Sequence, residues 1–190
     1  MMRYDPERHH RRSIRLRGYD YAQPGAYFVT ICTRNKELFF EDDGIRIIAE
    51  RCWLAIPKHF PYVQLDAWVV MPNHVHGVLW IVRRGVQLNA PTRGISPRRG
   101  TLSVVVRTYK AAVTTQCRRD GYGYFGWQRN YYEHIVRNEE ELNRIREYIF
   151  NNPLRWHLDR ENPERVGEDD FDRWLNKVSE RLVEGGTNHV

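Results

Sequence analysis

The sequence has few cysteines and no long apolar run, and each shortage excludes a class of protein. The 190 residues include three cysteines, which lie far apart and form no CxxC pair: Cys32, Cys52 and Cys117. This pattern argues against a disulfide framework and favours a reduced, bacterial-type cytoplasmic setting. No stretch approaches the roughly 20 apolar residues that cross a membrane. The basic start of the chain is followed by no apolar run, so we expect neither a signal peptide nor a membrane partner.

Acidic residues are unevenly spread along the chain. The whole sequence carries +6, although residues 159–190 hold nine Asp or Glu against five Lys or Arg, a net charge of −4. The part before residue 159 therefore carries +10. Such a basic body suggests a polyanionic partner, because basic side chains that neutralise phosphates release counterions. A well-solvated surface explains the same charge, so charge alone does not decide between the two.

The charge distribution also divides the chain into segments. Residues 1–18 are basic and poor in apolar groups, and we expect a mobile arm there. Residues 83–100 contain five Arg, three Gly and two Pro but no acid, which is typical of a flexible basic loop. Residues 19–160 are expected to form one domain. Residues 161–190 are expected to form an acidic tail with a short amphipathic helix around residues 171–178.

Hydrophobic periodicity predicts the elements of the domain. The predicted strands are 26–33, 62–71, 74–82 and 127–136. The predicted helices are an amphipathic one that ends at Pro57, a second over 102–118 and a third over 139–150. Asn138 can cap the third helix, with Glu141 in a capping-box position. The order strand, helix, strand, strand, helix, strand is the split βαβ, ferredoxin-like arrangement, an α+β fold with an antiparallel sheet and an added C-terminal helix.

His74 and His76 are the first candidates for chemistry. They are separated by one residue on a predicted strand, so both imidazoles point from the same face. Two neutral imidazole nitrogens can converge on one divalent cation and leave positions open for substrate oxygens. A chain with eight histidines also produces such a pair by chance. The spacing alone leaves both interpretations open.

The helix predicted over 139–150 could complete such a site. Leu142, Ile145 and Ile149 form its apolar stripe. Tyr148, at the edge of that stripe, could face the histidines while its neighbours anchor the helix on the sheet. Asn152 lies one turn further on. From the residues alone, Tyr148 could equally be a packed boundary tyrosine, and Asn152 a residue that ends the helix.

Three blocks of the sequence resemble a known family. They are Trp68–Gly77 (WVVMPNHVHG), Trp127–Asn138 (WQRNYYEHIVRN) and Arg146–Arg155 (REYIFNNPLR). In this order and spacing they are similar to the single-tyrosine HUH transposases and, within these, most similar to the REP-associated tyrosine transposases. The resemblance covers roughly residues 12–163.

The resemblance implies a role for each candidate residue. His74 and His76 match the family's two metal-binding histidines, and Tyr148 matches the nucleophile, so that the helix bearing it is the catalytic helix. Asn152, four residues later, matches the third metal ligand, where many members have Gln. The implied cofactor is Mg²⁺ or Mn²⁺. The implied reaction is attack of the tyrosine on a DNA phosphate, which leaves a 5′-phosphotyrosine and a free 3′-hydroxyl and can be reversed to join strands.

The implied partner is single-stranded or hairpin DNA associated with repeats, bound by a cytoplasmic, nucleoid-associated enzyme. Candidates for contact with its phosphates lie in the basic arm and basic loop: Arg11, Arg12, Arg15, Arg17, Arg93, Arg98 and Arg99. Trp127, Tyr131 and Tyr132 could stack on unpaired bases or simply pack in the sheet. Tyr131 and Tyr132 are also rival nucleophiles by chemistry, outside the family's helix. Related enzymes work as dimers, so a homodimer stays open.

Three other functions remain open on the sequence. A domesticated, catalytically silent relative would bind DNA hairpins without cutting them. A metal-dependent hydrolase unrelated to this family would use the histidines, with Tyr148 only structural. An RNA-binding ferredoxin-like domain would need no metal. The joint presence of His74, His76 and Tyr148 favours the enzyme that nicks and rejoins DNA.

Overall fold

The computed structural model describes residue 21, residues 23–82 and residues 101–185, and side chains up to residue 178. Its four strands form one sheet in the order β2-β3-β1-β4, and each neighbouring pair is antiparallel. The strands are β1 (Gly25–Cys32), β2 (Val63–Met71), β3 (His74–Ile81) and β4 (Tyr132–Val136). The helices are α1 (Asp43–Leu54), α2 (Ile56–His59), α3 (Leu102–Arg119), α4 (Glu139–Asn151) and α5 (Asp170–Gly185), with short 3₁₀ segments η1 (Arg34–Lys36), η2 (Phe39–Glu41) and η3 (Asn152–Leu158). This arrangement confirms the predicted α+β class with an antiparallel sheet.

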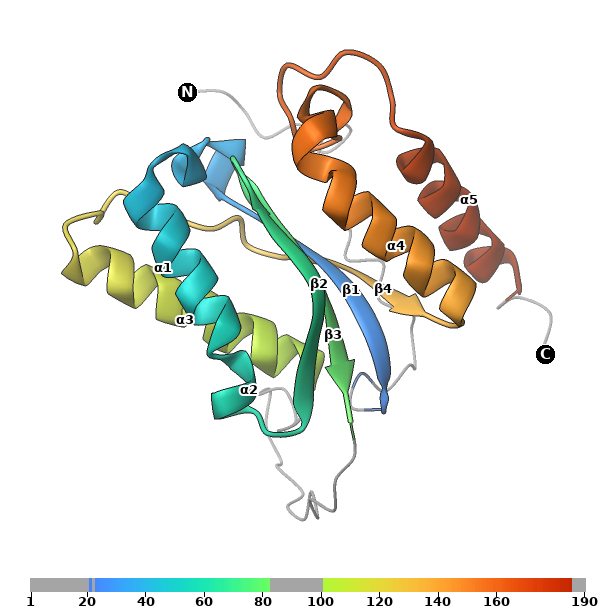
Figure 1. The fold of residues 1–190 in the computed structure, drawn as a ribbon, viewed down its shortest axis with the longest axis horizontal. Helices are drawn as coiled ribbons and strands as arrows, with labels where there is room; N and C mark the ends of the chain where they lie inside the picture. The colour runs from blue at the N-terminus through green and yellow to red at the C-terminus, as the bar shows by residue number, and fades with distance from the viewer. Residues whose placement is uncertain (1–20, 22, 83–100, 186–190) are drawn as a thin grey trace.

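Helices cover both faces of the sheet (Figure 1). Helices α1 and α3 lie on one face, and α4 and α5 on the other. The pleat of β1 supplies both cores, because alternate side chains point to opposite faces. Tyr27 and Val29 belong to the core under α1 and α3, whereas Ala26 and Phe28 belong to the core under α4 and α5. The two central strands are therefore buried on both sides.

Gly77 brings α1 close to the centre of β3. A Cβ placed on Gly77 would lie 2.2 Å from the Cζ2 atom of Trp53 on α1, so the indole occupies the space that any side chain would need. Gly77 and Val75 point toward α1 and α3. By the same alternation His74 and His76 point toward α4.

Side-chain hydrogen bonds cap α4 and hold it on the sheet. The Asn138 side chain accepts a hydrogen bond from the Glu141 backbone N–H at 2.8 Å, which confirms the predicted cap. The Glu141 carboxylate accepts from the Arg137 backbone N–H at 2.7 Å and contacts His134 Nε2 on β4 at 2.7 Å. Further along the helix, Arg146 donates two hydrogen bonds to the carboxylate of Asp66 on β2, at 2.9 and 2.7 Å.

The structure differs from the predicted elements mainly in three places. The fourth strand begins at Tyr132, while Trp127 forms only an isolated bridge with Thr33. Helix α1 ends at Leu54, and Pro57 instead occupies the first turn of α2, where its missing N–H costs no hydrogen bond. Part of the expected acidic tail packs on the domain, since Phe171 and Leu175 of α5 are buried against α4. No helix among the described residues is both long and apolar enough to span a membrane.

Candidate functional site

The two histidines of β3 lie side by side in the interior. Their ring centroids are 4.2 Å apart, and their exposed fractions are 0% for His74 and 1% for His76. Their Nδ1 atoms face hydrogen-bonding side chains: His74 Nδ1 lies 2.9 Å from Asn73 Oδ1, and His76 Nδ1 lies 2.9 Å from Thr30 Oγ1. The two Nε2 atoms are thereby turned toward one point between the sheet and the segment after α4.

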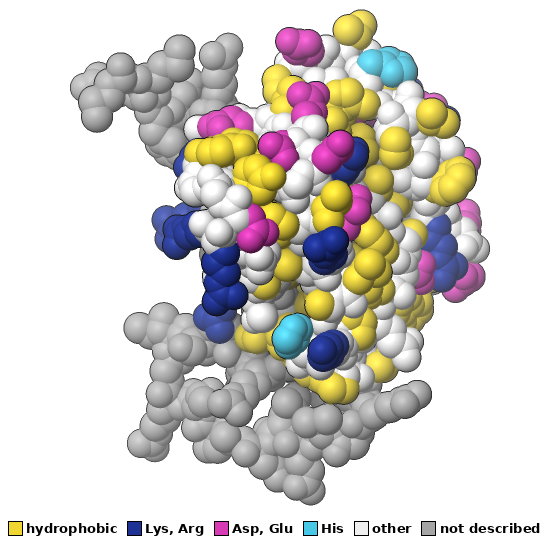
Figure 2. Space-filling view, turned by 60° about the vertical axis from the view of Figure 1, so that its left-hand side comes forward, with side chains coloured by type: hydrophobic (Ala, Val, Ile, Leu, Met, Phe, Trp, Pro, Cys, Tyr) yellow, Lys and Arg dark blue, Asp and Glu magenta, His cyan; other side chains and the backbone are white. Residues whose placement is uncertain are grey.

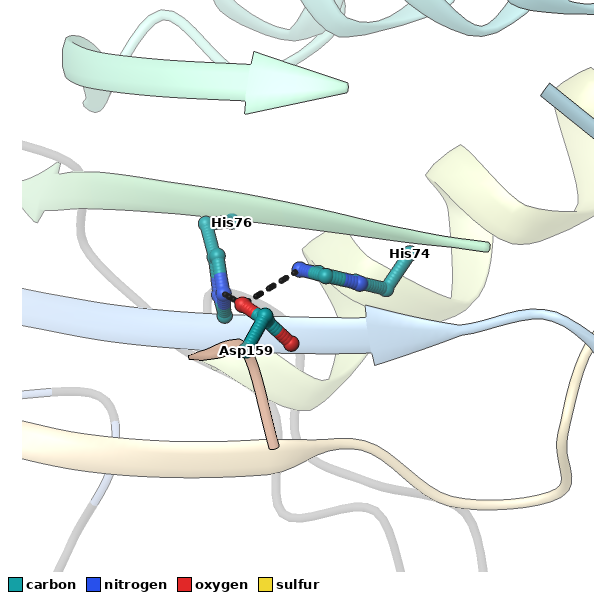
Figure 3. A group of neighbouring side chains, drawn as sticks. All are labelled: His74, His76 and Asp159. Atoms are coloured by element: carbon teal, nitrogen blue, oxygen red, sulfur yellow. Dashed lines mark ion pairs between the residues drawn. The ribbon is translucent and has the colours of Figure 1, made fainter. Parts of the chain in front are cut away.

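Asp159 supplies the third group at that point. It follows η3, and its side chain reaches toward the histidines from the opposite side (Figure 3). Its Oδ2 atom lies 3.7 Å from the Nε2 atom of each histidine. Burial alone would raise the pKa of this carboxyl, but its interactions with His76 and His74 outweigh burial and hold the pKa well below its usual value. Asp159 is therefore a carboxylate anion.

Tyr148 contacts the same cluster from α4. Its hydroxyl donates a hydrogen bond to Asp159 Oδ2 at 3.1 Å and lies 3.2 Å from His76 Nε2. Burial is the largest cause that raises the pKa of this phenol well above 10, and the charge of Asp159 adds to it. In this arrangement Tyr148 is a neutral phenol hydrogen-bonded at the cluster.

Asn152 also lies at the cluster, through Asp159. Its Nδ2 atom donates to Asp159 Oδ2 at 2.8 Å. Its Oδ1 atom is buried and has no hydrogen-bond partner among the described residues. A buried acceptor left without a partner costs free energy. The position of this oxygen beside a carboxylate therefore points to a bound group, such as a cation, that oxygen atoms can coordinate.

The donor set fits a divalent cation in kind and in spacing. His74, His76 and Asp159 each offer one ligand atom, and these three atoms lie within 4.8 Å of one another. In the described part of the chain this is the one group of three or more His, Cys, Asp or Glu side chains that is so close. Imidazole nitrogen and carboxylate oxygen are common ligands of divalent metals. Metal–ligand bonds of about 2.0–2.2 Å place neighbouring ligand atoms about 3–4 Å apart, which agrees with the two 3.7 Å separations.

Helix α5 covers the tyrosine. The ring of Phe171 stacks on that of Tyr148, with centroids 3.8 Å apart and planes at 10°, and Tyr148 is 7% exposed. A small cavity remains beside Tyr148 and His76, and Arg160 and Asp172 line it. Tyr148 is thus enclosed between the sheet and α5.

Asp172 is an unusual side chain of this covering helix. It is 2% exposed, and neither carboxylate oxygen has a hydrogen-bond partner among the described residues. Arg160 faces it at 3.6 Å. Burial raises the pKa of Asp172 to about 6; Arg160 opposes the rise and Asp159 adds to it. Docking of α5 therefore carries the cost of burying a carboxylate near neutral pH.

The structure brings together the four residues that the resemblance singled out and adds Asp159 to them. Asp159 was missed because it lies after Pro153, in a segment without periodicity. The available signal was an acidic residue shortly after the helix that carries Tyr148. The predicted DNA-contacting arginines lie outside the described residues: Arg11, Arg12, Arg15, Arg17, Arg93, Arg98 and Arg99.

The aromatic candidates of the Trp127–Asn138 block are partly buried. Trp127 and Tyr131 pack against the core under α1 and α3, and Tyr132 packs against the core under α4 and α5. Tyr132 also lines the cavity beside Tyr148, with the Arg160 guanidinium 5.8 Å from its ring centroid. His134, to which the sequence assigned no role, ties β4 to α4 through Glu141.

Fold and site together define an α+β protein whose antiparallel sheet carries a buried His-His-Asp cluster beside a tyrosine hydroxyl. The chain is 41% identical over 175 residues to an uncharacterized protein of Haemophilus influenzae, and the match covers 83% of this chain and 96% of that protein. The chain belongs to the same family as this protein. No family model matches the sequence.

More distant relatives carry a functional name. The chain is 23% identical over 135 residues to the REP-associated tyrosine transposase of Escherichia coli, which covers 71% of this chain and 70% of the relative. Among solved structures, the fold is similar to that of a REP-associated tyrosine transposase bound to a REP hairpin. That match has a TM-score of 0.54 and 23% identity and covers 72% of this chain and 70% of the other.

Proposed function

We propose that this protein is a metal-dependent tyrosine transposase-type enzyme that cleaves and rejoins single-stranded, hairpin or repeat-associated DNA. The observation that carries the proposal is the position of the Tyr148 hydroxyl, 3.1 Å from Asp159 Oδ2 and 3.2 Å from His76 Nε2. A tyrosine at a cluster of metal-type ligands is the arrangement that phosphoryl transfer to a protein hydroxyl requires. The similarity to REP-associated tyrosine transposases supports the same class of reaction.

His74, His76 and Asp159 would hold the cation, Mg²⁺ or Mn²⁺, with Asn152 Oδ1 as a further ligand. The bound cation would withdraw charge from the phosphate and from the attacking oxygen. Asp159 would be the third metal ligand, the role that the resemblance assigned to Asn152. Asn152 instead supports Asp159 through its Nδ2 atom and offers its free oxygen to the same point.

Tyr148 would be the nucleophile. Its phenol oxygen forms a bond to phosphorus while the bond from phosphorus to the 3′-oxygen breaks. The leaving strand ends in a 3′-hydroxyl, and the other strand stays on the protein as a 5′-phosphotyrosine. Asp159 Oδ2 accepts a hydrogen bond from the phenol, which orients the attacking oxygen. The phenol gives up its proton to solvent as the bond to phosphorus forms, and the departing 3′-oxygen takes up a proton. Attack by another 3′-hydroxyl reverses the step and joins strands without a nucleotide cofactor.

Several finer assignments belong to the same proposal. The strand order β2-β3-β1-β4 supports a ferredoxin-like domain over 19–160, with α4 as its catalytic helix. On the face of the molecule toward α1 and α3, Lys and Arg side chains gather along one edge (Figure 2), which supports a polyanionic partner. The seven arginines of the arm and loop would contact DNA phosphates. We assign the enzyme to the nucleoid-associated cytoplasm and leave a homodimer as a further arrangement to test.

The cover formed by α5 favours one alternative, a domesticated protein that binds DNA hairpins without cutting them. Phe171 occupies the ring face of Tyr148, so a substrate must displace α5 before it reaches the hydroxyl. In a silent binder this helix would stay docked. In an active enzyme it would open during turnover.

The two functions separate in an assay with labelled hairpin DNA from the genomic flanks, run with and without Mn²⁺ on a denaturing gel. The enzyme should yield a protein–DNA adduct that requires the metal and disappears in Tyr148→Phe and His74→Ala. Tyr148→Phe should still bind DNA, because it removes one buried hydroxyl and leaves the surface unchanged. DNA binding without an adduct, whichever divalent metal is added, would favour the silent binder. DNA cleavage by the Tyr148→Phe variant would refute the assignment of Tyr148 as the nucleophile.

A further inference from the structure

Asn73 lies at the start of β3, immediately before the two histidines, and its side chain is fully engaged in hydrogen bonds. Its exposed fraction is 0%. Its Nδ2 atom donates to the backbone carbonyl of Lys36 at 3.1 Å and to that of Glu161 at 2.8 Å. Its Oδ1 atom lies 2.9 Å from His74 Nδ1. One buried amide thus joins three segments that are far apart in the sequence.

These contacts determine which way the amide faces. A carbonyl oxygen can only accept a hydrogen bond, so the NH₂ end of Asn73 must point toward the carbonyls of Lys36 and Glu161. The oxygen end then points toward His74. Because that oxygen only accepts, His74 Nδ1 must carry a proton and donate it. This hydrogen bond fixes the orientation of the ring, so that the other nitrogen, Nε2, faces Asp159.

The same amide also holds the carboxylate on the other side of His74. Asn73 binds the carbonyl of Glu161, and the Glu161 backbone N–H donates to Asp159 Oδ1 at 2.6 Å. The other oxygen, Asp159 Oδ2, faces His74 Nε2 at 3.7 Å. The hydrogen bonds run from Nδ1 of His74 through Asn73, Glu161 and Asp159 and return to the Nε2 side of the same ring.

The backbone around Lys36 supports a functional interpretation of this connection. Asn35 and Lys36 both have positive φ, at 53° and 58°, a conformation that L side chains adopt at a cost. In this conformation the Lys36 carbonyl meets Asn73, and the Lys36 ammonium donates to the Arg160 carbonyl at 3.2 Å. The turn is held in a strained form by contacts with the segment that carries Asp159.

We propose that Asn73 is a positioning residue that orients the His74 ring through its Nδ1–H group and, through Glu161, places Asp159 opposite Nε2. The inference deepens the proposed function and rests on it for the role of the cation. Partners of metal ligands of this kind typically change metal affinity by about 10–100-fold when they are removed. Asn73 would thus prepare two of the three ligands at once.

The direct test is long-range ¹H–¹⁵N NMR of the imidazole rings in the metal-free protein. The wild type should show His74 with a protonated Nδ1. Asn73→Leu, which has nearly the same volume but no polar atom, should lose the Nδ1 proton and leave the ring protonated on Nε2, beside Asp159. Asn73→Asp keeps an acceptor beside Nδ1 and should keep the proton there, although it loses the N–H groups that bond the carbonyls of Lys36 and Glu161. Asn130→Leu, at an exposed asparagine, is the matched control.

Mn²⁺ binding, followed by the EPR signal of the free ion, gives the second readout. Asn73→Leu should bind Mn²⁺ about 10–100-fold more weakly than the wild type and the Asn130→Leu control. An unprotonated His74 Nδ1 in the wild type, or an Nδ1 that stays protonated in Asn73→Leu, would overturn the inference. Failure of the wild type to bind Mn²⁺ would overturn the proposed function, while the protonation of Nδ1 would still decide the role of Asn73.

Discussion

Phe171→Ala should loosen α5 and expose Tyr148. Phe171 is 5% exposed, stacks on Tyr148 at 3.8 Å and meets the ring of Phe28 edge-on at 5.9 Å. Truncation of a buried phenylalanine costs about 3–5 kcal/mol in a protein core. The sheet and α4 keep their own core without this side chain, so we expect the loss to fall mainly on the docking of α5.

The size of the effect follows from this free energy. A loss of about 3 kcal/mol raises the undocked population roughly 100-fold, since 1.4 kcal/mol corresponds to a factor of ten. Backbone amides of α5 should therefore exchange with deuterium about 100-fold faster, while those of β1 and β3 keep their protection. If docking limits access of DNA to Tyr148, adduct formation should accelerate by a similar factor, up to the point at which the undocked form predominates.

Phe150→Ala is the matched control for this experiment. Phe150 is on α4, two residues from Tyr148, but its side chain is 82% exposed. Its truncation removes the same atoms without loss of a buried contact, and exchange in α5 should remain at the wild-type rate. Unchanged α5 exchange in Phe171→Ala would refute the reasoning, as would equal acceleration throughout the sheet.

Three further substitutions test the anchors around the site. Asp66→Asn should destabilise the fold by about 2 kcal/mol at pH 7 in chemical denaturation, because it removes a charged acceptor of two Arg146 hydrogen bonds. Arg146 lowers the pKa of Asp66 from 3.8 to about 2, so the difference between variant and wild type should be complete above about pH 4 and shrink as the pH falls toward 2. Asp172→Asn should instead stabilise the docked α5 at pH 8 by up to about 3 kcal/mol, since burial raises the pKa of Asp172 to about 6. Deuterium exchange should show this gain shrink as the pH falls below about 6 and disappear by about pH 4. Gly77→Ala should lower the melting temperature by several degrees, because its Cβ would overlap the Trp53 indole; an unchanged melting temperature would mean that α1 can shift.

Much of the architecture could be predicted because it depends on local periodicity. The period of two places His74 and His76 on one face, and the spacing of Ile145 and Ile149 places their helix against the sheet. Tyr148 reaches the histidines because it lies one residue from that stripe. These relations follow from the repeat of a single strand and a single helix, without knowledge of the loops between them.

Asp159 and the cover could not be predicted because they depend on long-range contacts. Asp159 is placed by hydrogen bonds to Tyr148, Asn152 and the Glu161 backbone, none of which leaves a periodic signal. The sequence predicted an acidic tail with a short amphipathic helix, but it gave no position for that helix on the domain. Asp172 and Glu161 are buried, facing Arg160 at 3.6 and 3.7 Å. Composition cannot distinguish a solvated carboxylate from one enclosed beside an arginine.

The most direct test of the central claim is to locate the covalent bond to DNA. The protein would be incubated with Mn²⁺ and hairpin DNA, then digested with nuclease and trypsin and examined by mass spectrometry. Cleavage after arginine places Tyr148 as the single tyrosine of peptide 147–155, whereas Tyr131 and Tyr132 lie in peptide 130–137. The account predicts a nucleotide on Tyr148. A nucleotide on peptide 130–137, or cleaved DNA without any modified peptide, would contradict it.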